Sequence, residues 1–317
     1  MSEKVIKAYK GFGKNMQCRG FQYEIGKEYD IDGEIELCKQ GFHACKSPIE
    51  VWSYYDMIGD GTRFAEVELS GKILEDNSST KVCASHIKIK NELSLTDMIN
   101  LGVAYFKDIT SLPKVKTNNL RVFKDIEEES NTGLTQLNID ENISVISIND
   151  PNVMIMNNAF LVSINVNGNH NQICSTGDEA RITSTGRDNK IVSTGNFVSI
   201  LSSNVFNRIA STGKAANIVS TGSMTEIVST GDNSTIITNG EHVCIDSDGK
   251  NNRIVCNGRD TKVKAKAGTL ITLTEYDHGC INNVKTEYVD GVNIKEDTWY
   301  GIKNGEFIET PPYPFRG

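Results

Sequence analysis

Hydrophobic positions in the second half of the chain recur with a period of nine. Isoleucine occupies every ninth position from Ile146 to Ile254, Val263 continues the column, and Leu137 stands one step before it. Glycine opens nearly every repeat. Helix-pair solenoids need more than about thirty residues per unit, whereas nine residues hold a strand of about five and a tight turn. The pattern predicts a parallel β-solenoid in which the isoleucines point inward.

A second pattern indicates how many repeats make one coil. Two positions before the isoleucine, alternate repeats carry asparagine, at 171, 189 and 207, and the repeats between them carry alanine or valine, at 180, 198 and 216. This alternation predicts an eighteen-residue coil with two unlike faces, so that each nonapeptide is a half-coil. We expect the corner glycines to adopt positive φ. We also expect the hydroxyls of the Ser-Thr pairs beside them to bond turn backbone.

The residue after each isoleucine should point outward from the solenoid. On one face this position predicts an exposed apolar stripe, and such surfaces often mark contacts with a partner. Two interpretations stay open: a second copy or partner binds the stripe, or another segment of the same chain covers it. The candidate interface residues are Leu201, Val219, Ile237 and Val255.

The flanking regions lack this period. Residues 1–110 read as an α+β domain, with strands expected at 5–12, 21–31, 34–38 and 63–71. Ser47-Pro48-Ile49-Glu50 has the form of a capping box with proline at the first helical position, which predicts a helix through Met57. Another helix is expected from Ser94 to about Asp108.

The remaining boundaries complete the predicted architecture. A polar connector covers 111–136, the solenoid 137–267, and a small β cap 268–317. The cap strands are expected at 269–276, 283–289, 292–300 and 306–309, with turns at Asp290-Gly291 and Asn304-Gly305. The predicted fold class is therefore mainly β: a parallel β-solenoid of nine-residue half-coils between an α+β domain and a β cap.

Composition narrows the possible functions. The 317 residues carry a net charge of −8, which disfavours non-specific nucleic-acid binding. Within 146–266, 11 basic residues nearly balance 10 acidic ones, so an acidic mimic of DNA is disfavoured. We expect neither secretion nor a membrane partner, because no leader and no run of about eighteen apolar residues occurs.

Eight cysteines without a Cys-x-x-Cys pair indicate reduced thiols in a cytosolic protein. One group falls in the first ninety residues. It reads as ordinary core residues, with zinc as the alternative. The repeats lack the acidic column of calcium-binding nonapeptides. We therefore expect no metal and no cofactor. The members of that group are Cys18, Cys38, His43, Cys45, Cys83 and His86.

Several sequence blocks carry a resemblance. They are KAYKGFGKNMQCRGFQYEIGKEY, CKQGFHACKSPIEVWSYY, RFAEVELSG and the tail VDGVNIKEDTWYGIKNGEF. With the repeat, the chain resembles an uncharacterised family of phage and prophage proteins in which a similar N-terminal domain is fused to Ser/Thr-Gly repeats. The resemblance implies expression in a bacterial cytoplasm and no established activity.

A second resemblance concerns GFHACKSPIEVWSYY followed by RFAEVELSG, which is similar to the ADP-ribosyltransferase fold. It implies that His43 stands where that family has a nicotinamide-stacking tyrosine, which is a departure from the family pattern. No catalytic glutamate can be assigned, since Glu66 and Glu68 alternate with Val67 as on the solvent face of a strand. The implied pocket lies between the opening strand and the GFHAC strand. Its candidate ligand-binding residues are Lys10, Arg19, His43, Glu66 and Glu68.

These observations predict a non-enzymatic phage-type binding protein with a counter-defence role. The solenoid would be a rigid scaffold that self-associates into a homo-oligomer. The N-terminal domain would bind a host protein or a nucleotide ligand. The alternative is an ADP-ribosyltransferase-like domain that binds, sequesters or processes a NAD-derived nucleotide. If the two residues have no functional role, His43 is a packed histidine and Arg19 pairs with surface carboxylates.

Overall fold

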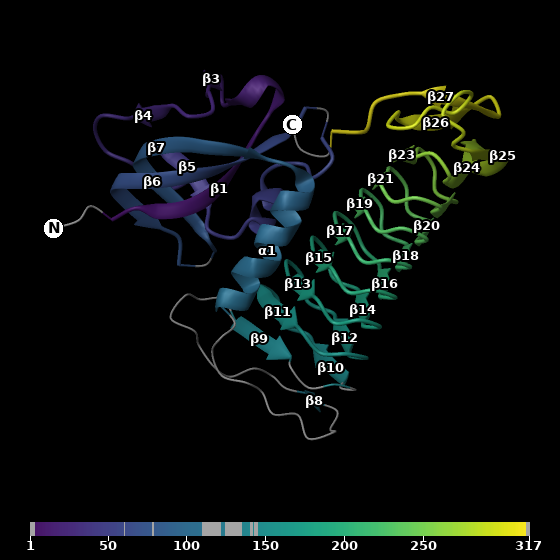
Figure 1. The fold of residues 1–317 in the computed structure, drawn as a ribbon, viewed down its shortest axis with the longest axis horizontal. Helices are drawn as coiled ribbons and strands as arrows, with labels where there is room; N and C mark the ends of the chain where they lie inside the picture. Colours follow the sequence, from purple (N-terminus) through teal and green to yellow (C-terminus); the bar gives the residue numbers. More distant parts are fainter. Residues whose placement is uncertain are drawn as a thin grey trace. The chain divides into compact units, whose positions relative to one another are not determined.

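The computed structural model describes residues 4–59, 61–77, 79–109, 122–123, 135–139, 142 and 145–314. The chain forms two compact units, of which the first contains the described residues up to Ile109 and the second contains the solenoid and the cap (Figure 1). The predicted connector at 111–136 lies outside the described residues, apart from 122–123 and 135–136.

The solenoid consists of two parallel sheets, whose strands alternate along the chain (Figure 1). Each strand from β10 to β21 pairs with the strand eighteen residues later, as in Ile164↔Ile182 and Ile173↔Ile191. The fold class and the two-face coil are therefore confirmed. The even-strand sheet contains β8 (Val122–Phe123), β10 (Val145–Ile148), β12 (Ser163–Val166), β14 (Arg181–Ser184), β16 (Ser199–Ser202), β18 (Asn217–Ser220), β20 (Thr235–Thr238) and β22 (Arg253–Cys256). The odd-strand sheet contains β9 (Thr135–Ile139), β11 (Val153–Asn157), β13 (Gln172–Ser175), β15 (Lys190–Ser193), β17 (Arg208–Ser211), β19 (Glu226–Ser229), β21 (Cys244–Ser247) and β23 (Lys262–Ala265).

The isoleucine column forms one continuous core between the two sheets. Leu137, the isoleucines from Ile146 to Ile254 and Val263 all belong to a single buried cluster. Leu137 therefore begins the column. Because successive strand residues face opposite sides, the residue two positions after each isoleucine also points inward.

That inward position belongs to the serines of the Ser-Thr pairs, and the prediction that they bond turn backbone is wrong for most of them. Two of the threonines that follow reach amides one coil earlier: Thr176 Oγ1 donates to Asn158 Oδ1 at 3.0 Å, and Thr185 Oγ1 donates to Asn167 Oδ1 at 2.9 Å. At this inward position, the buried hydroxyls without a hydrogen-bond partner among the described residues are those of Ser193, Ser202, Ser211, Ser220, Ser229 and Thr238.

The alternating asparagines form a ladder in the interior. The backbone N–H of Asn171 donates to Asn189 Oδ1 at 2.8 Å, and the N–H of Asn189 donates to Asn207 Oδ1 at 2.8 Å. All three side chains are fully buried, and each oxygen bonds a corner of the coil before it. At the other corner, Ala180, Val198 and Ala216 fill this position, but the later coils use the same bond, since the N–H of Ser234 donates to Asn252 Oδ1 at 2.7 Å.

The corner glycines have another role than the predicted one. None of the glycines that open the repeats from Gly168 to Gly258 has positive φ. A Cβ on Gly186 would lie 1.9 Å from the carbonyl oxygen of Gly168, so these positions require the absence of a side chain because coils stack closely. Positive φ occurs two residues later, as at Asp188 (53°) and Ala215 (53°). There the backbone N–H bonds the next coil, as Ala215 does to Asp232 O at 2.8 Å.

The cap closes the two sheets separately. β24 (Leu270–Asp277) continues the even-strand sheet and pairs antiparallel with β25 (Cys280–Tyr288). β26 (Tyr300–Lys303) pairs with β23, and β27 (Glu306–Glu309) completes the odd-strand sheet. The turn at Asn304-Gly305 is confirmed by φ values of 53° and 75°. The strand expected at 292–300 is wrong except for Tyr300. Instead, Asp290 Oδ1 accepts the N–H groups of Val292 and Asn293 in a tight turn.

The N-terminal unit is built on a closed antiparallel sheet in the order β4-β7-β5-β1-β6, in which β6 pairs with β7 as well. The sheet closes around a core that includes Phe12, Val67 and Ile87. Its strands are β1 (Ile6–Phe12), β4 (Glu28–Asp30), β5 (Phe42–Cys45), β6 (Arg63–Glu75) and β7 (Lys81–Leu93); a hairpin of β2 (Gln17–Cys18) and β3 (Phe21–Gln22) and the 3-10 turn η1 (Lys14–Met16) follow β1.

Several expectations for this unit change. No strand was predicted at β7, although it is the strand that joins three others. The expected strand at 21–31 is two short strands, and 34–38 forms no strand, only an isolated bridge between Glu36 and Gln40. These loop segments form one side of the hollow described below.

The two expected helices have opposite outcomes. α1 (Leu95–Ile109) is confirmed, and Ser94 and Asp97 cap it reciprocally, because Ser94 N–H bonds Asp97 Oδ2 at 2.9 Å and Asp97 N–H bonds Ser94 Oγ at 3.1 Å. The helix from Ser47 to Met57 is wrong: only the 3-10 turn η2 (Ile49–Ser53) forms. Its capping acid is used elsewhere, since Glu50 Oε2 accepts the N–H of Thr80 at 2.9 Å and its hydroxyl at 2.6 Å.

Candidate functional site

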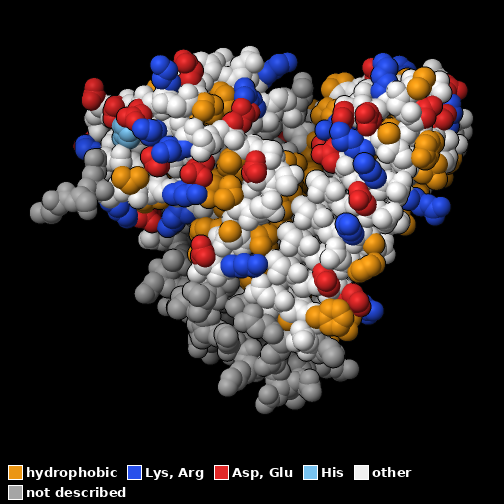
Figure 2. Space-filling view, viewed as in Figure 1, with side chains coloured by type: hydrophobic (Ala, Val, Ile, Leu, Met, Phe, Trp, Pro, Cys, Tyr) orange, Lys and Arg blue, Asp and Glu red, His pale blue; other side chains and the backbone are white. Residues whose placement is uncertain are grey.

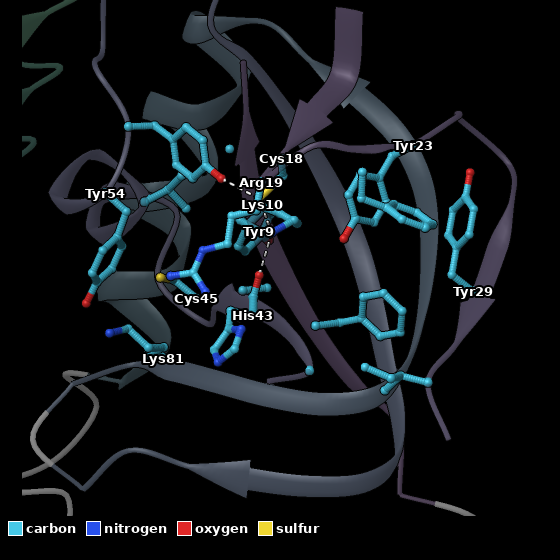
Figure 3. A pocket seen from close by; sticks show the side chains of 18 of the residues that line it. Tyr9, Lys10, Cys18, Arg19, Tyr23, Tyr29, His43, Cys45, Tyr54 and Lys81 are labelled. Atoms are coloured by element: carbon cyan, nitrogen blue, oxygen red, sulfur yellow. Dashed lines mark hydrogen bonds between the residues drawn. The ribbon is translucent and has the colours of Figure 1, made fainter. Parts of the chain in front are cut away.

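The N-terminal unit contains a hollow of about 790 Å³. Its wall is formed by β1, β4, β5, the loop at 38–41 and the residues that follow η2, and Lys81 at the start of β7 adds one edge. Gly11 on β1 allows this arrangement, because a Cβ there would lie 2.4 Å from the ring of Tyr55. Arg19, His43, Tyr54 and Lys81 lie toward one side, and Tyr23 and Tyr29 toward the other (Figure 3).

Lys10 is a buried cation in this wall, with 5 % of its surface exposed. Its Nζ donates to the backbone oxygen of His43 at 3.0 Å and to Cys18 Sγ at 3.6 Å. The ammonium also lies 5.5 Å from the ring centre of Phe12 and 5.7 Å from that of Tyr23, within cation–π range. Burial lowers the pKa of Lys10.

Arg19 and Lys81 add two further cations. Arg19 is exposed and makes only long bonds to the carbonyl of Cys38, at 3.4 and 3.5 Å. Lys81 Nζ lies 4.3 Å from the ring centre of Tyr54 and 3.3 Å from Cys38 Sγ. Within the described residues, no ion pair joins Lys10, Arg19 or Lys81 to a carboxylate. One hollow thus gathers three positive charges that the described chain leaves without an acidic partner.

His43 is half-buried on β5, and its ring has a defined hydrogen bond. Nε2 accepts the backbone N–H of Cys38 at 2.9 Å, which places the proton of the neutral ring on Nδ1. Burial and the nearby charge of Lys10 lower the pKa of His43. The neutral imidazole therefore holds the loop at 38–41, and its Nε2 is not free to accept a proton from a substrate.

The opposite side of the hollow is aromatic. The ring of Tyr23 meets those of Phe12 and Tyr29 edge to face, with 5.3 Å between centres in each pair. Phe21 lies 4.8 Å from Tyr23 and 5.3 Å from Tyr29 in similar geometry. Edge-to-face clusters are rigid and present flat apolar surface. Burial raises the pKa of Tyr23, so its hydroxyl stays protonated.

The acids at the rim are already paired. Glu28 bonds Lys88, and Asp30 Oδ1 lies 2.7 Å from His86 Nδ1. Glu66 and Glu68 do not line the hollow. They lie on β6, where Glu66 pairs with Lys7 at 2.9 Å and Glu68 with Lys90 at 3.0 Å. Of the five ligand-binding candidates, the structure brings Lys10, Arg19 and His43 together and removes both glutamates from the site.

Three thiols, of Cys18, Cys38 and Cys45, also line the hollow. Cys18 Sγ lies 3.0 Å from the hydroxyl of Tyr55, whose pKa is raised by burial and by this contact. Among the described residues, no three His, Cys, Asp or Glu side chains gather in a way that could hold a metal ion. The cysteine–histidine group seen in the sequence thus does not converge there.

Lys81, Tyr23 and Tyr29 line the hollow but were not among the predicted site residues. Lys81 is distant in sequence from Lys10, and no local pattern links them. The aromatic spacing in Phe21-Gln22-Tyr23 and the nearby Tyr29 was the available signal. It indicates one apolar wall only once the short strands are known to turn back on each other.

The predicted interface stripe lies on the outward face of the even-strand sheet. Leu201 is 45 % exposed, and Val219, Ile237 and Val255 are each partly exposed. In the strand register, these four side chains are stacked in one column. Their use as an interface stays a prediction.

Comparison with known proteins adds one finding. A family model described as a domain of unknown function (DUF7666) matches residues 6–101, which include all strands of the closed sheet and the start of α1. No curated protein and no solved structure matches the chain. None of the helices in the described residues has the length and apolar character needed to cross a membrane. The chain thus carries, at residues 6–101, a domain similar to this family of unknown function.

Proposed function

We propose that this chain is a non-enzymatic binding protein whose N-terminal unit holds a small organic anion with a flat apolar group. The solenoid would serve as its rigid scaffold. The observation that carries the proposal is the gathering of Lys10, Arg19 and Lys81, without acidic partners among the described residues, around a hollow with an aromatic wall. The volume of about 790 Å³ falls within the usual range of small-molecule sites.

The charges supply the physical reason. Removing a cation from water is unfavourable unless an opposite charge or several hydrogen bonds offset the loss. Among the described residues, Lys10 has one carbonyl and one sulfur as its hydrogen-bond partners. A ligand phosphate or carboxylate would provide the missing charge, and Arg19 is suited to grip it with two parallel hydrogen bonds.

A nucleotide combines the two required features, a charged group and a flat ring. A NAD-derived nucleotide is therefore the second candidate ligand, and the hollow favours binding or sequestration over processing. Glu66 and Glu68 lie in ion pairs outside it, and the Nε2 of His43 already accepts a hydrogen bond. The phage origin, the counter-defence role and the location in a bacterial cytoplasm remain predictions, and they rest on the sequence resemblance alone.

Calorimetry on the full chain with NAD, ADP-ribose, AMP and cyclic nucleotides tests this proposal. We expect saturable binding of at least one anion, weakening as salt rises because charges are screened. Lys81→Met and Arg19→Met should each weaken it by about tenfold or more, the usual scale for losing a charged hydrogen bond. Lys90→Met is the matched control, because Lys90 lies on the same strand as Lys81 but pairs with Glu68 outside the hollow.

Two outcomes contradict the proposal. One is the absence of heat for every anion tested with a folded chain. The other is an affinity that Lys81→Met and Lys90→Met reduce equally, which would locate binding elsewhere. Turnover of NAD by the wild-type chain would replace the binding function with an enzymatic one.

A further inference from the structure

The two solenoid sheets end in very different strands. β27 has four residues, and glutamates stand at both ends of it. β25 has nine residues and is the last described strand of its sheet (Figure 1). Proteins protect exposed sheet edges by keeping them short and charged, because an unpaired edge can pair with another chain. By this criterion the β27 edge is protected and the β25 edge is open.

The open edge also carries exposed apolar side chains. Ile281, Val284, Tyr288 and Val292 are between 54 % and 77 % exposed. Hydrophobic side chains gather at this end of the solenoid on the face in view (Figure 2). Val284 and Tyr288 point to the same side of the strand, since residues two and four apart share a face. This concentration of apolar surface on an unpaired edge marks a site of association.

From this edge we propose that two copies of the chain associate by antiparallel pairing of β25 with β25 of the second copy. The sequence of the strand is self-complementary about Thr286. With Thr286 on the two-fold axis, Lys285 of one copy lies opposite Glu287 of the other, and Val284 lies opposite Tyr288. Two-fold symmetry repeats each pair, so the contact contains two charge pairs and two apolar pairs.

The faces of the strand agree with this register. Val284, Thr286 and Tyr288 are exposed on one face, and Lys285 and Glu287 are half-buried on the other. Lys285 Nζ lies 3.1 Å from its own Glu287 and also bonds Glu306, so the ammonium stands among carboxylates. Directly opposed cross-strand pairs of these kinds each stabilise antiparallel sheets by about 0.2–1 kcal/mol.

This contact joins the two even-strand sheets edge to edge, and it differs from the predicted stripe of Leu201, Val219, Ile237 and Val255. The inference rests on the proposed scaffold role and specifies that a second copy of the chain binds, through β25. It makes no use of the hollow in the N-terminal unit. Ligand calorimetry and oligomeric state can therefore fail independently.

Cysteine cross-linking of the full chain tests the register. In a background with Cys38→Ser and Cys280→Ser, Thr286→Cys should form a covalent dimer on mild oxidation, because the two copies of residue 286 face each other on the axis. Val284→Cys is the matched control. In this register its two copies are separated by four residues of strand, roughly 13 Å, which exceeds the reach of a disulfide.

Charge exchange tests the same contact in solution by sedimentation velocity. Glu287→Lys places lysine opposite Lys285 of the other copy and should weaken the dimer by about tenfold. The double exchange Lys285→Glu with Glu287→Lys restores opposite charges and should recover most of that loss. Circular dichroism of each variant verifies the fold.

Four results overturn the inference. Two concern the oligomeric state: a wild-type chain that stays monomeric at high concentration, and a dimer that Glu287→Lys leaves intact. The other two concern cross-linking: a covalent dimer through Val284→Cys in preference to Thr286→Cys, or one that forms only with a Leu201→Cys variant. The last would assign association to the stripe.

Discussion

The solenoid and the N-terminal unit use β-structure in opposite ways. In the solenoid, strands pair in parallel with the strands one coil before and after them, and the inward isoleucine and serine repeat from layer to layer. In the N-terminal unit, β6 pairs antiparallel with both β1 and β7, so distant segments close one sheet. A stack of equivalent layers distributes its stabilisation evenly along the rod. A closed sheet of unlike strands brings unlike side chains around one hollow.

The two units therefore differ in the kinds of side chain that they bring together. Within the solenoid, the inward positions repeat a few residue types, namely aliphatic residues, serine or threonine, and asparagine. Around the hollow, cations, aromatic rings and thiols occur within one small volume. A regular repeat is well suited to length and stiffness, and an irregular sheet to recognition. The predictions below test how far this contrast extends.

Deletion of solenoid residues should show the largest effect, and it should depend on parity. Removing eighteen residues, Gly186 to Ser203, keeps every strand above a strand of the same sheet, so a shorter folded rod is expected. Removing nine, Gly186 to Thr194, places the asparagine corner on the other sheet and connects the cap to the wrong one. We expect that variant to lose its cooperative unfolding transition in circular dichroism. Equal melting of both variants would contradict the two-face coil.

A single charge in the isoleucine column is the next largest effect. Ile209 is fully buried, and Ile209→Asp places a carboxylate between apolar layers, which should cost about 4 kcal/mol or more. Val219→Asp is the matched control, since Val219 is partly exposed on the outward face and should change stability by about 1 kcal/mol or less. Urea unfolding measures both. Similar losses would mean that the outward face is covered.

The corner geometry predicts a smaller effect that differs between two positions of the same corner. A Cβ on Gly213 would lie 1.7 Å from the carbonyl oxygen of Gly195, so Gly213→Ala should destabilise by about 2 kcal/mol or more. Ala215 has φ of 53°, and Ala215→Gly should leave stability within about 1 kcal/mol because glycine tolerates this conformation. If Ala215→Gly were the damaging change, close stacking would not explain the glycine column. Thermal unfolding distinguishes the two.

The smallest predicted effect is a dependence on pH at the end of the solenoid. Burial raises the pKa of Asp246 to about 6, above its ordinary value, although Lys264 lies 2.7 Å away. The folded chain therefore binds this proton more tightly than the unfolded chain. The contribution of Asp246 to the free energy of unfolding should rise as pH falls through about 6 and level off near its unfolded pKa of about 4.

Asp246→Asn isolates this contribution. The variant should be more stable than wild type at neutral pH, and the difference should shrink as the solution is acidified toward pH 5 in urea titrations. A difference that is constant with pH would show that the buried carboxylate is not the cause.

Particular residues show where sequence reasoning succeeded and where it failed. The isoleucine column, Leu137 and the asparagine alternation predicted the coil, because neighbours in a solenoid stand at a fixed distance in sequence. α1 was predicted from Ser94 and Asp97, which lie three residues apart and cap its first turn. The helix from Ser47 failed because Glu50 bonds Thr80, thirty residues away. A local motif cannot reveal that competition.

The sequence by itself determined the repeat, its two faces, the buried column and the helix at 95–109, since each depends on residues at short or constant separation. Only the tertiary structure decided that Lys10, Arg19 and His43 share a hollow with Lys81 and the tyrosines, and that Glu66 and Glu68 do not. It also decided that the corner glycines are required by the carbonyl of the coil below. Both outcomes depend on which backbones approach each other across the fold, and this approach is set by packing of the whole unit.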